Sequence, residues 1–144
     1  MGQSMTPEML RAYIRDTPAM NKVFAGVEFL DKDYQAAVFW GKERILGIPP
    51  FINNFVPTDV PLDTQRIGCL AALFEMAALL AIRNQSNLSE QGVPVPVGEN
   101  AQHYERLTDK YTGIFEGKVH KYKVAVNMTN SFKYQGGVYK NIAR

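Results

Sequence analysis

The chain has very few of the residues that usually carry catalysis or bind metals. It contains one cysteine and two histidines in 144 residues. The lone Cys69 cannot form an internal disulfide, so nothing favours a secreted, disulfide-built fold. His103 and His120 lie on one predicted helix, roughly 25 Å apart at 1.5 Å per residue, and cannot share a metal. No metal-ligand spacing is present, and we therefore expect no cofactor and no metal site.

Cys69 and Glu75 are the reactive side chains within the most apolar stretch of the sequence. Glu75 could be a general base with a raised pKa. It could instead pair with an Arg or Tyr of another helix, or lie on the one face that meets solvent. No nucleophile or second acid accompanies it, which favours a structural role. No histidine lies near Cys69 in the pattern, and buried cysteines are usually inert. We expect no catalytic residues and no enzymatic activity.

Acidic residues are missing from the last 27 residues. Residues 118–144 hold six Lys or Arg and no Asp or Glu, whereas the whole chain has a net charge of +2. The preceding 117 residues therefore carry a net charge of about −4. Unlike potentials attract and set the register of two partners. An acidic body with a basic end is thus suited to bind a neighbouring copy of itself.

The length predicts one domain, and 46% hydrophobic with 21% charged residues is typical of a soluble globular protein. Apolar residues at steps of three and four predict helices over residues 31–46 and 100–126. A Thr-Pro-Glu start signal predicts a short helix over 7–15, and an Ala/Leu-rich run predicts a helix over 62–85, placed third in the chain. The third is apolar nearly all round and should form the centre of a bundle. It is short for a membrane span and contains Glu75, so we expect no membrane association. The fold class is mainly α, a small helical bundle with a long C-terminal helix.

Two segments between these helices are rich in proline. Residues 49–61 hold four prolines together with Phe51 and Phe55, and we expect an extended Pro-rich loop that lies against the protein or a partner. Residues 86–98 alternate Val and Pro, which favours an edge strand or an extended loop. Residues 19–29 give weak signals, and within them Val27 and Phe29 indicate a brief extended piece or a loop.

The C-terminal residues predict a separate docking arm. We expect residues 127–131 to end the last helix, which divides the chain into a bundle domain (1–130) and an arm (131–144) with a hinge at Gly136 and Gly137. The arm combines apolar and basic side chains that a free tail would leave in water. The predicted docking residues are Phe132, Tyr134, Val138, Tyr139, Lys140, Ile142 and Arg144, with Phe51 and Phe55 of the loop.

The order of these features resembles the small head-to-tail connector (neck or adaptor) proteins of tailed bacteriophages. The resemblance covers roughly residue 31 to the C-terminus, and the first thirty residues depart from it. It rests on a helix ending in Ile48-Pro49-Pro50, a Pro/Phe-rich loop, an Ala/Leu helix closing with Ala81-Ile82-Arg83-Asn84-Gln85, the segment Gly92–Val97, the Tyr-bearing helix Tyr104–Tyr122 and the arm.

The resemblance implies a structural protein of the virion neck, present in the host cytoplasm during assembly. Copies would form a ring, commonly of twelve, that joins the portal protein to tail or neck proteins. Double-stranded DNA would pass through the lumen without sequence-specific contacts. A baseplate or other tail structural protein is an alternative. A second alternative is a small basic helical regulator that binds nucleic acid through Lys118, Lys121, Lys123 and Arg144.

Overall fold

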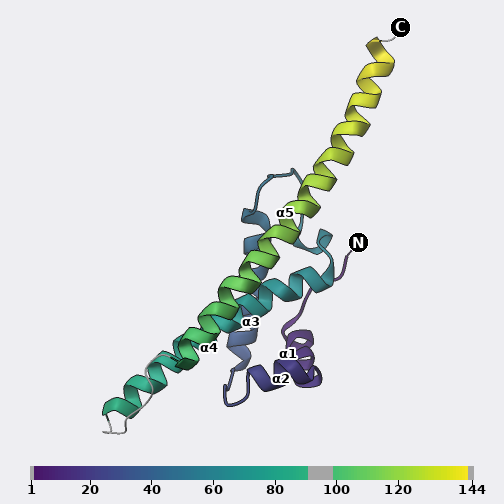
Figure 1. Ribbon diagram of the computed structural model, residues 1–144. Coiled ribbons are helices and arrows are strands. Elements are labelled where there is room, and N and C mark those ends of the chain that lie inside the picture. The colour runs from purple at the N-terminus through teal and green to yellow at the C-terminus, as the bar shows by residue number, and fades with distance from the viewer. Residues whose placement is uncertain (1, 91–98, 143–144) are drawn as a thin grey trace.

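The computed structural model describes residues 2–90 and 99–142, and it describes side chains for residues 2–83 and 101–129 (Figure 1). Its elements in chain order are α1 (Pro7–Asp16), α2 (Pro18–Val23), α3 (Asp31–Gly47), the short 3-10 helix η1 (Pro57–Asp59), α4 (Leu62–Glu90) and α5 (Glu99–Ile142). No strand occurs within these described residues. The prediction of a mainly helical bundle with a long C-terminal helix is confirmed.

The two N-terminal helices each begin at a proline. In α1 the Thr6 hydroxyl accepts a hydrogen bond from the Met9 backbone N–H at 3.2 Å, and Pro7 occupies the first turn, where its missing N–H costs nothing. The short helix α2 was not predicted from the weak signals of residues 19–29, whereas Val27 and Phe29 lie in the loop that follows it, one of the two alternatives expected for them. Pro18 begins α2 in the same way, and burial of Met20 holds this six-residue helix on the core.

Helix α3 follows the predicted pattern closely. The Asp33 carboxylate accepts a hydrogen bond from the Leu30 N–H at 2.8 Å, which satisfies one of the free donors at the start of the helix. The stripe expected from the spacing is buried, namely Tyr34, Ala37, Val38, Gly41 and Ile45.

Helix α4 is the central helix, as predicted from its apolar composition. Its segment Leu62–Arg83 has a mean hydropathy of 1.6, and among the described residues this is the one helix long and apolar enough to cross a membrane. However, 56% of the 18-residue apolar stretch within this segment is buried inside the fold, which is typical of a core helix. Gly68 lies directly beneath the Phe115 ring, where an added Cβ would come within 2.6 Å of ring carbons. Glycine therefore allows α4 and α5 to approach closely at this point.

Two apolar clusters make up the core. The larger joins α1, α2, α3, α4 and the start of α5, with Leu10, Phe24 and Phe74 among its buried members. The smaller lies beneath the Pro-rich loop and includes Ile45 and Phe115. Since both clusters use α4 or α5, the long helices form the frame on which the shorter ones pack.

A single buried amide, Gln65, ties the N-terminal segment and the loop to α4. Its Oε1 accepts a hydrogen bond from the Met5 N–H at 3.0 Å, and its Nε2 donates to the carbonyls of Gln3 at 2.9 Å and Val60 at 2.8 Å. Because all three bonds are made inside or at the edge of the core, Gln65 satisfies backbone groups that would otherwise be buried without partners.

Helix α5 is longer than predicted. We expected it to end at residues 127–131, but it continues to Ile142, so the arm residues 131–142 are helical and the glycine pair predicted as a hinge lies inside the helix. Asn, Thr, Ser and Gly are weak helix formers that cost at most about 1 kcal/mol each. They do not stop a helix as proline does, and no proline follows Pro96. Figure 1 shows the last turns of α5 projecting well beyond the bundle, as expected.

The remaining helix boundaries differ by a few residues. Helix α4 extends to Glu90, five residues past the predicted end, because nothing in residues 86–90 breaks a helix. The first part of the segment predicted to be extended (86–98) is therefore helical. Its Val/Pro part, residues 91–98, lies outside the described residues.

Candidate functional site

A buried lysine joins the end of α3 to α5. Lys123 is 1% exposed, and its Nζ donates hydrogen bonds to the carbonyl oxygens of Ile45 and Ile48, the latter at 2.6 Å. These carbonyls belong to the last turn and C-cap of α3, which have no donors within their own helix. The negative end of the α3 dipole also favours a cation there. Lys123 thus caps one helix from another.

Side chains around Lys123 extend this contact along the loop. The Phe55 ring lies 5.1 Å from the Lys123 ammonium, and its centroid is 6.3 Å from that of Tyr122. One turn earlier on α5, His120 Nδ1 lies 2.9 Å from the Pro49 carbonyl oxygen. The loop is therefore fixed to α5 at three points, which confirms that it lies against the protein rather than free in solvent.

A pair of exposed charges supports the same contact between α3 and α5. Arg44 Nε donates to Glu116 Oε1 at 3.2 Å. Both side chains are substantially exposed, so this ion pair contributes at most about 1 kcal/mol. The buried lysine, rather than the surface pair, is the stronger determinant of how α3, the loop and α5 are joined.

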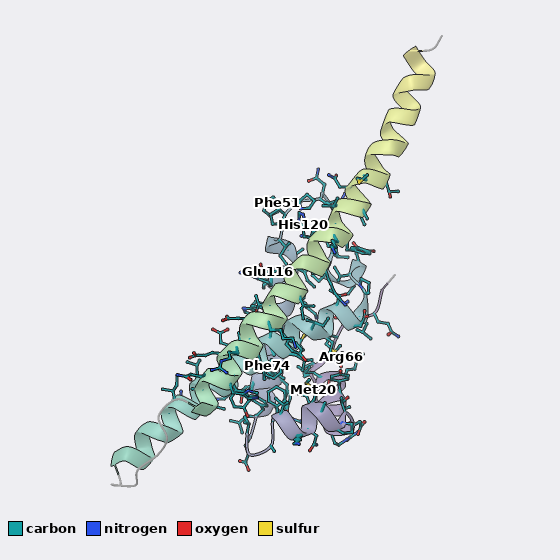
Figure 2. The ribbon with its side chains drawn as sticks, in the orientation of Figure 1. Met20, Phe51, Arg66, Phe74, Glu116 and His120 are labelled. Carbon is teal, nitrogen blue, oxygen red and sulfur yellow. The ribbon has the colours of Figure 1, made fainter. Side chains whose placement is uncertain are left out.

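The two predicted docking residues of the loop differ in availability. Phe51 is 76% exposed, whereas Phe55 is half-buried against Tyr122 and Lys123. Figure 2 shows Phe51 and His120 at the end of the bundle from which α5 projects. Phe51 is therefore presented to solvent beside the base of the projecting helix, while Phe55 already has partners within the chain. The docking role of both residues stays a prediction.

The predicted arm residues fall on the last turns of α5. Phe132, Tyr134, Val138, Tyr139, Lys140 and Ile142 lie on this helix, in a part whose side chains are not described, and Arg144 lies outside the described residues. Just before them, Asn127, Met128 and Thr129 are exposed. The helix therefore leaves the bundle before the predicted docking residues begin.

The basic patch proposed for nucleic-acid binding is not assembled as predicted. Lys118 and Lys121 are exposed on α5, but Lys123 is buried beneath the loop. Its ammonium group is used by the α3 carbonyls, so it cannot reach a phosphate without breaking the fold. The spacing along the helix places Lys123 on the face that packs on the bundle with Phe115 and Val119, a signal present in the sequence that charge counting overlooked.

The titratable residues weighed as catalytic candidates have structural surroundings. Cys69 is buried, and burial raises the pKa of its thiol to about 12. Its sulfur therefore stays protonated and unreactive at neutral pH. Glu75 is exposed on the solvent face of α4, which is one of the structural roles expected for it. His103 and His120 are also exposed, on different turns of α5.

Sequence reasoning missed a pocket between α1, α4 and α5. It has a volume of about 290 Å³ and is lined by Tyr13 and Tyr111, by the charged pair Asp63 and Arg66, and by the aliphatic side chains Ile67, Leu70 and Ile114. The Arg66 guanidinium carbon lies 4.3 Å from the centroid of the Tyr13 ring, on the side of α4 that faces α1 (Figure 2). The available signal was a charged pair at spacing i, i+3 just before the most apolar stretch of the chain.

Comparisons of the chain with protein-family models, with curated proteins and with solved structures give no match.

Proposed function

We propose that the chain is a structural subunit of the head-to-tail connector of a tailed bacteriophage. Copies form a ring between the portal and the tail, and DNA passes through the lumen. The observation that carries the proposal is the projecting part of α5, which leaves the bundle and carries basic and apolar residues without any acid.

A projecting helix of this kind needs a partner. Beyond Val126 the helix continues for about 16 residues, or about 24 Å at 1.5 Å per residue, without support from the bundle. Isolated helices of that length are marginal in water, because most helical stability in proteins comes from packing. Docking on a neighbouring subunit or on the portal would supply that packing. Apolar side chains would then provide binding free energy, and the basic residues would provide register and association rate.

The loop offers a second contact at the base of the same helix. Phe51 is a large side chain with 76% of its surface exposed, on a loop that contacts α5 through Phe55 and Pro49. An exposed aromatic on a fixed support loses little conformational freedom when it binds. This arrangement suits a subunit that is held at two places, by its loop and by its helix.

The nucleic-acid-binding alternative has less support because Lys123, one of its predicted contacts, is buried. Two exposed lysines, Lys118 and Lys121, remain among the described members of the patch. Two phosphate contacts give a shallow salt dependence, with a slope of about −2 in a plot of log K against log salt concentration. The alternative of a baseplate subunit shares the docking surfaces proposed above and differs only in where the ring lies.

Truncation after Ser131 tests the proposal. Among the described residues, the core ends at the buried Lys123 and the half-buried Val126. The truncated chain should therefore fold and unfold at the same midpoint temperature as the full chain when followed by circular dichroism. The truncated chain is then expressed during infection by a phage whose own gene for the chain is disrupted. It should be missing from purified particles, whereas a full-length chain with the same tag should be incorporated. Unfolding of the truncated chain, or its incorporation at the full-length level, would contradict the proposal.

A further inference from the structure

The pocket between α1, α4 and α5 has the make-up of a ligand site rather than of a packing defect. Its volume of about 290 Å³ is close to the lower end of known ligand pockets. Aliphatic side chains and the rings of Tyr13 and Tyr111 form most of its wall, while Asp63 and Arg66 add one negative and one positive charge. A mostly apolar wall with a few polar groups is the usual composition of such sites.

Arg66 carries the observation that points to a particular chemistry. Its Nε is closed to solvent and has no hydrogen-bond partner in the part of the chain that the structure describes. A buried donor without an acceptor costs free energy, and the cost is larger for a charged group. The Tyr13 ring covers one face of the guanidinium but supplies no acceptor oxygen to Nε. An acceptor oxygen that reached Nε would satisfy this donor.

The charges of the pocket select a monoanion. A planar guanidinium matches the two oxygens of a carboxylate and gives strong, charge-assisted hydrogen bonds. Asp63 lines the same pocket and repels negative charge, so a dianion such as a phosphate monoester is disfavoured. The apolar wall then requires an aromatic or aliphatic body on the carboxylate.

We propose that this pocket binds a small monocarboxylate with an aromatic or aliphatic body, with Arg66 as its anion partner. Tyr111 lines the same pocket and carries a hydroxyl donor. Burial, together with the neighbouring Tyr13, raises the pKa of Tyr111, so its hydroxyl keeps its proton at neutral pH. The carboxylate can belong to a free small molecule or to the end of a partner chain, since both present the same chemistry.

Titration of the full-length, 15N-labelled chain followed by NMR tests the proposal. The probes are benzoate, its neutral isostere benzamide, its cationic isostere benzamidine and the dianion phenyl phosphate. We expect benzoate to shift the amide signals around Arg66 and Tyr111 and to bind at least about tenfold more tightly than the other three. Arg66→Met should remove the preference for benzoate over benzamide, and Tyr111→Phe should weaken benzoate binding less than Arg66→Met does. Circular dichroism melts establish that both variants are folded, and Tyr111→Phe keeps the test valid should Arg66→Met not fold.

A second pair of probes separates the two sources of the carboxylate. N-acetylphenylalanine imitates the end of a chain, and its amide is the control. Tighter binding of N-acetylphenylalanine than of benzoate would assign the pocket to a partner's terminus, and the reverse order would assign it to a small molecule. The proposal is overturned by benzamidine binding as tightly as benzoate, by unchanged benzoate binding in Arg66→Met, or by the absence of binding of every carboxylate. None of these results depends on whether the chain is a connector subunit.

Discussion

Replacement of Lys123 by methionine isolates the contact that joins α3, the loop and α5. Methionine keeps the length and the apolar stem of lysine but removes the ammonium group. The carbonyls of Ile45 and Ile48 then lose their hydrogen-bond donor. Water does not readily replace it, because Lys123 is only 1% exposed. Lys123→Met therefore tests whether the end of α3 is held on α5 by specific hydrogen bonds or only by apolar packing.

The expected loss follows from two opposing terms. Each carbonyl left without a donor costs roughly 1–3 kcal/mol. Removal of a buried ammonium group relieves its desolvation, which offsets part of that cost. We expect a net loss of about 2–3 kcal/mol in the free energy of unfolding, which for a chain of this size lowers Tm by roughly 6–9 °C.

Lys121→Met is the matched control, because Lys121 is exposed two residues earlier on the same helix. Its effect should stay within about 0.5 kcal/mol. Urea unfolding followed by circular dichroism measures both variants against the wild-type chain. Equal stability of Lys123→Met and Lys121→Met would refute the capping role of Lys123.

The same pair of proteins, wild type and Lys123→Met, gives a pH dependence of known sign. Burial lowers the pKa of Lys123 below its ordinary value of 10.5. Between the folded and the unfolded pKa, the unfolded chain binds more protons, so stability rises with pH there. The stability advantage of the wild type over Lys123→Met should therefore increase as the pH rises towards 10.5. A decrease over that range would show that the carbonyl bonds favour the charged form more than burial disfavours it.

The remaining predictions concern α4 and α5. Gly68→Ala should destabilise the chain by about 1–3 kcal/mol, because its Cβ would meet the buried Phe115 ring. Gly113→Ala, where a Cβ meets nothing within 4 Å, should instead stabilise α5 by about 0.5–1 kcal/mol, and urea unfolding distinguishes the two outcomes. Cys69 should react with a thiol reagent such as DTNB only after denaturation, since its thiol is buried with a pKa raised to about 12. Rapid reaction in the native state would contradict that placement.

The helical fold is largely readable from the sequence, because it depends on apolar spacing and on proline. The stripe of α3 follows directly from residues recurring every three or four positions, and the burial of α4 follows from its being apolar nearly all round. Helix ends are less readable where no proline marks them. Weak helix formers at residues 127–131 suggested an end to α5, but their individual costs are too small to stop a helix that has already formed.

The candidate site is less readable, because it depends on contacts between distant residues. Lys123 looks like part of a basic patch when charges are counted along the chain, yet its carbonyl partners lie 75 and 78 residues away. The pocket around Arg66 also brings together three helices. Such groupings arise from tertiary packing, which one sequence does not reveal. The availability of Phe51 and the burial of Phe55 likewise become visible only once the loop is placed against α5.

The most direct test of the connector proposal is the position of the protein on a phage particle. On the proposal that the chain comes from a tailed phage, gold-labelled antibody against the bundle, applied to purified particles, should appear at the junction of head and tail by electron microscopy. Label at the distal tip of the tail would contradict the connector and support a baseplate subunit. Particles without any label would contradict a structural role in the virion altogether.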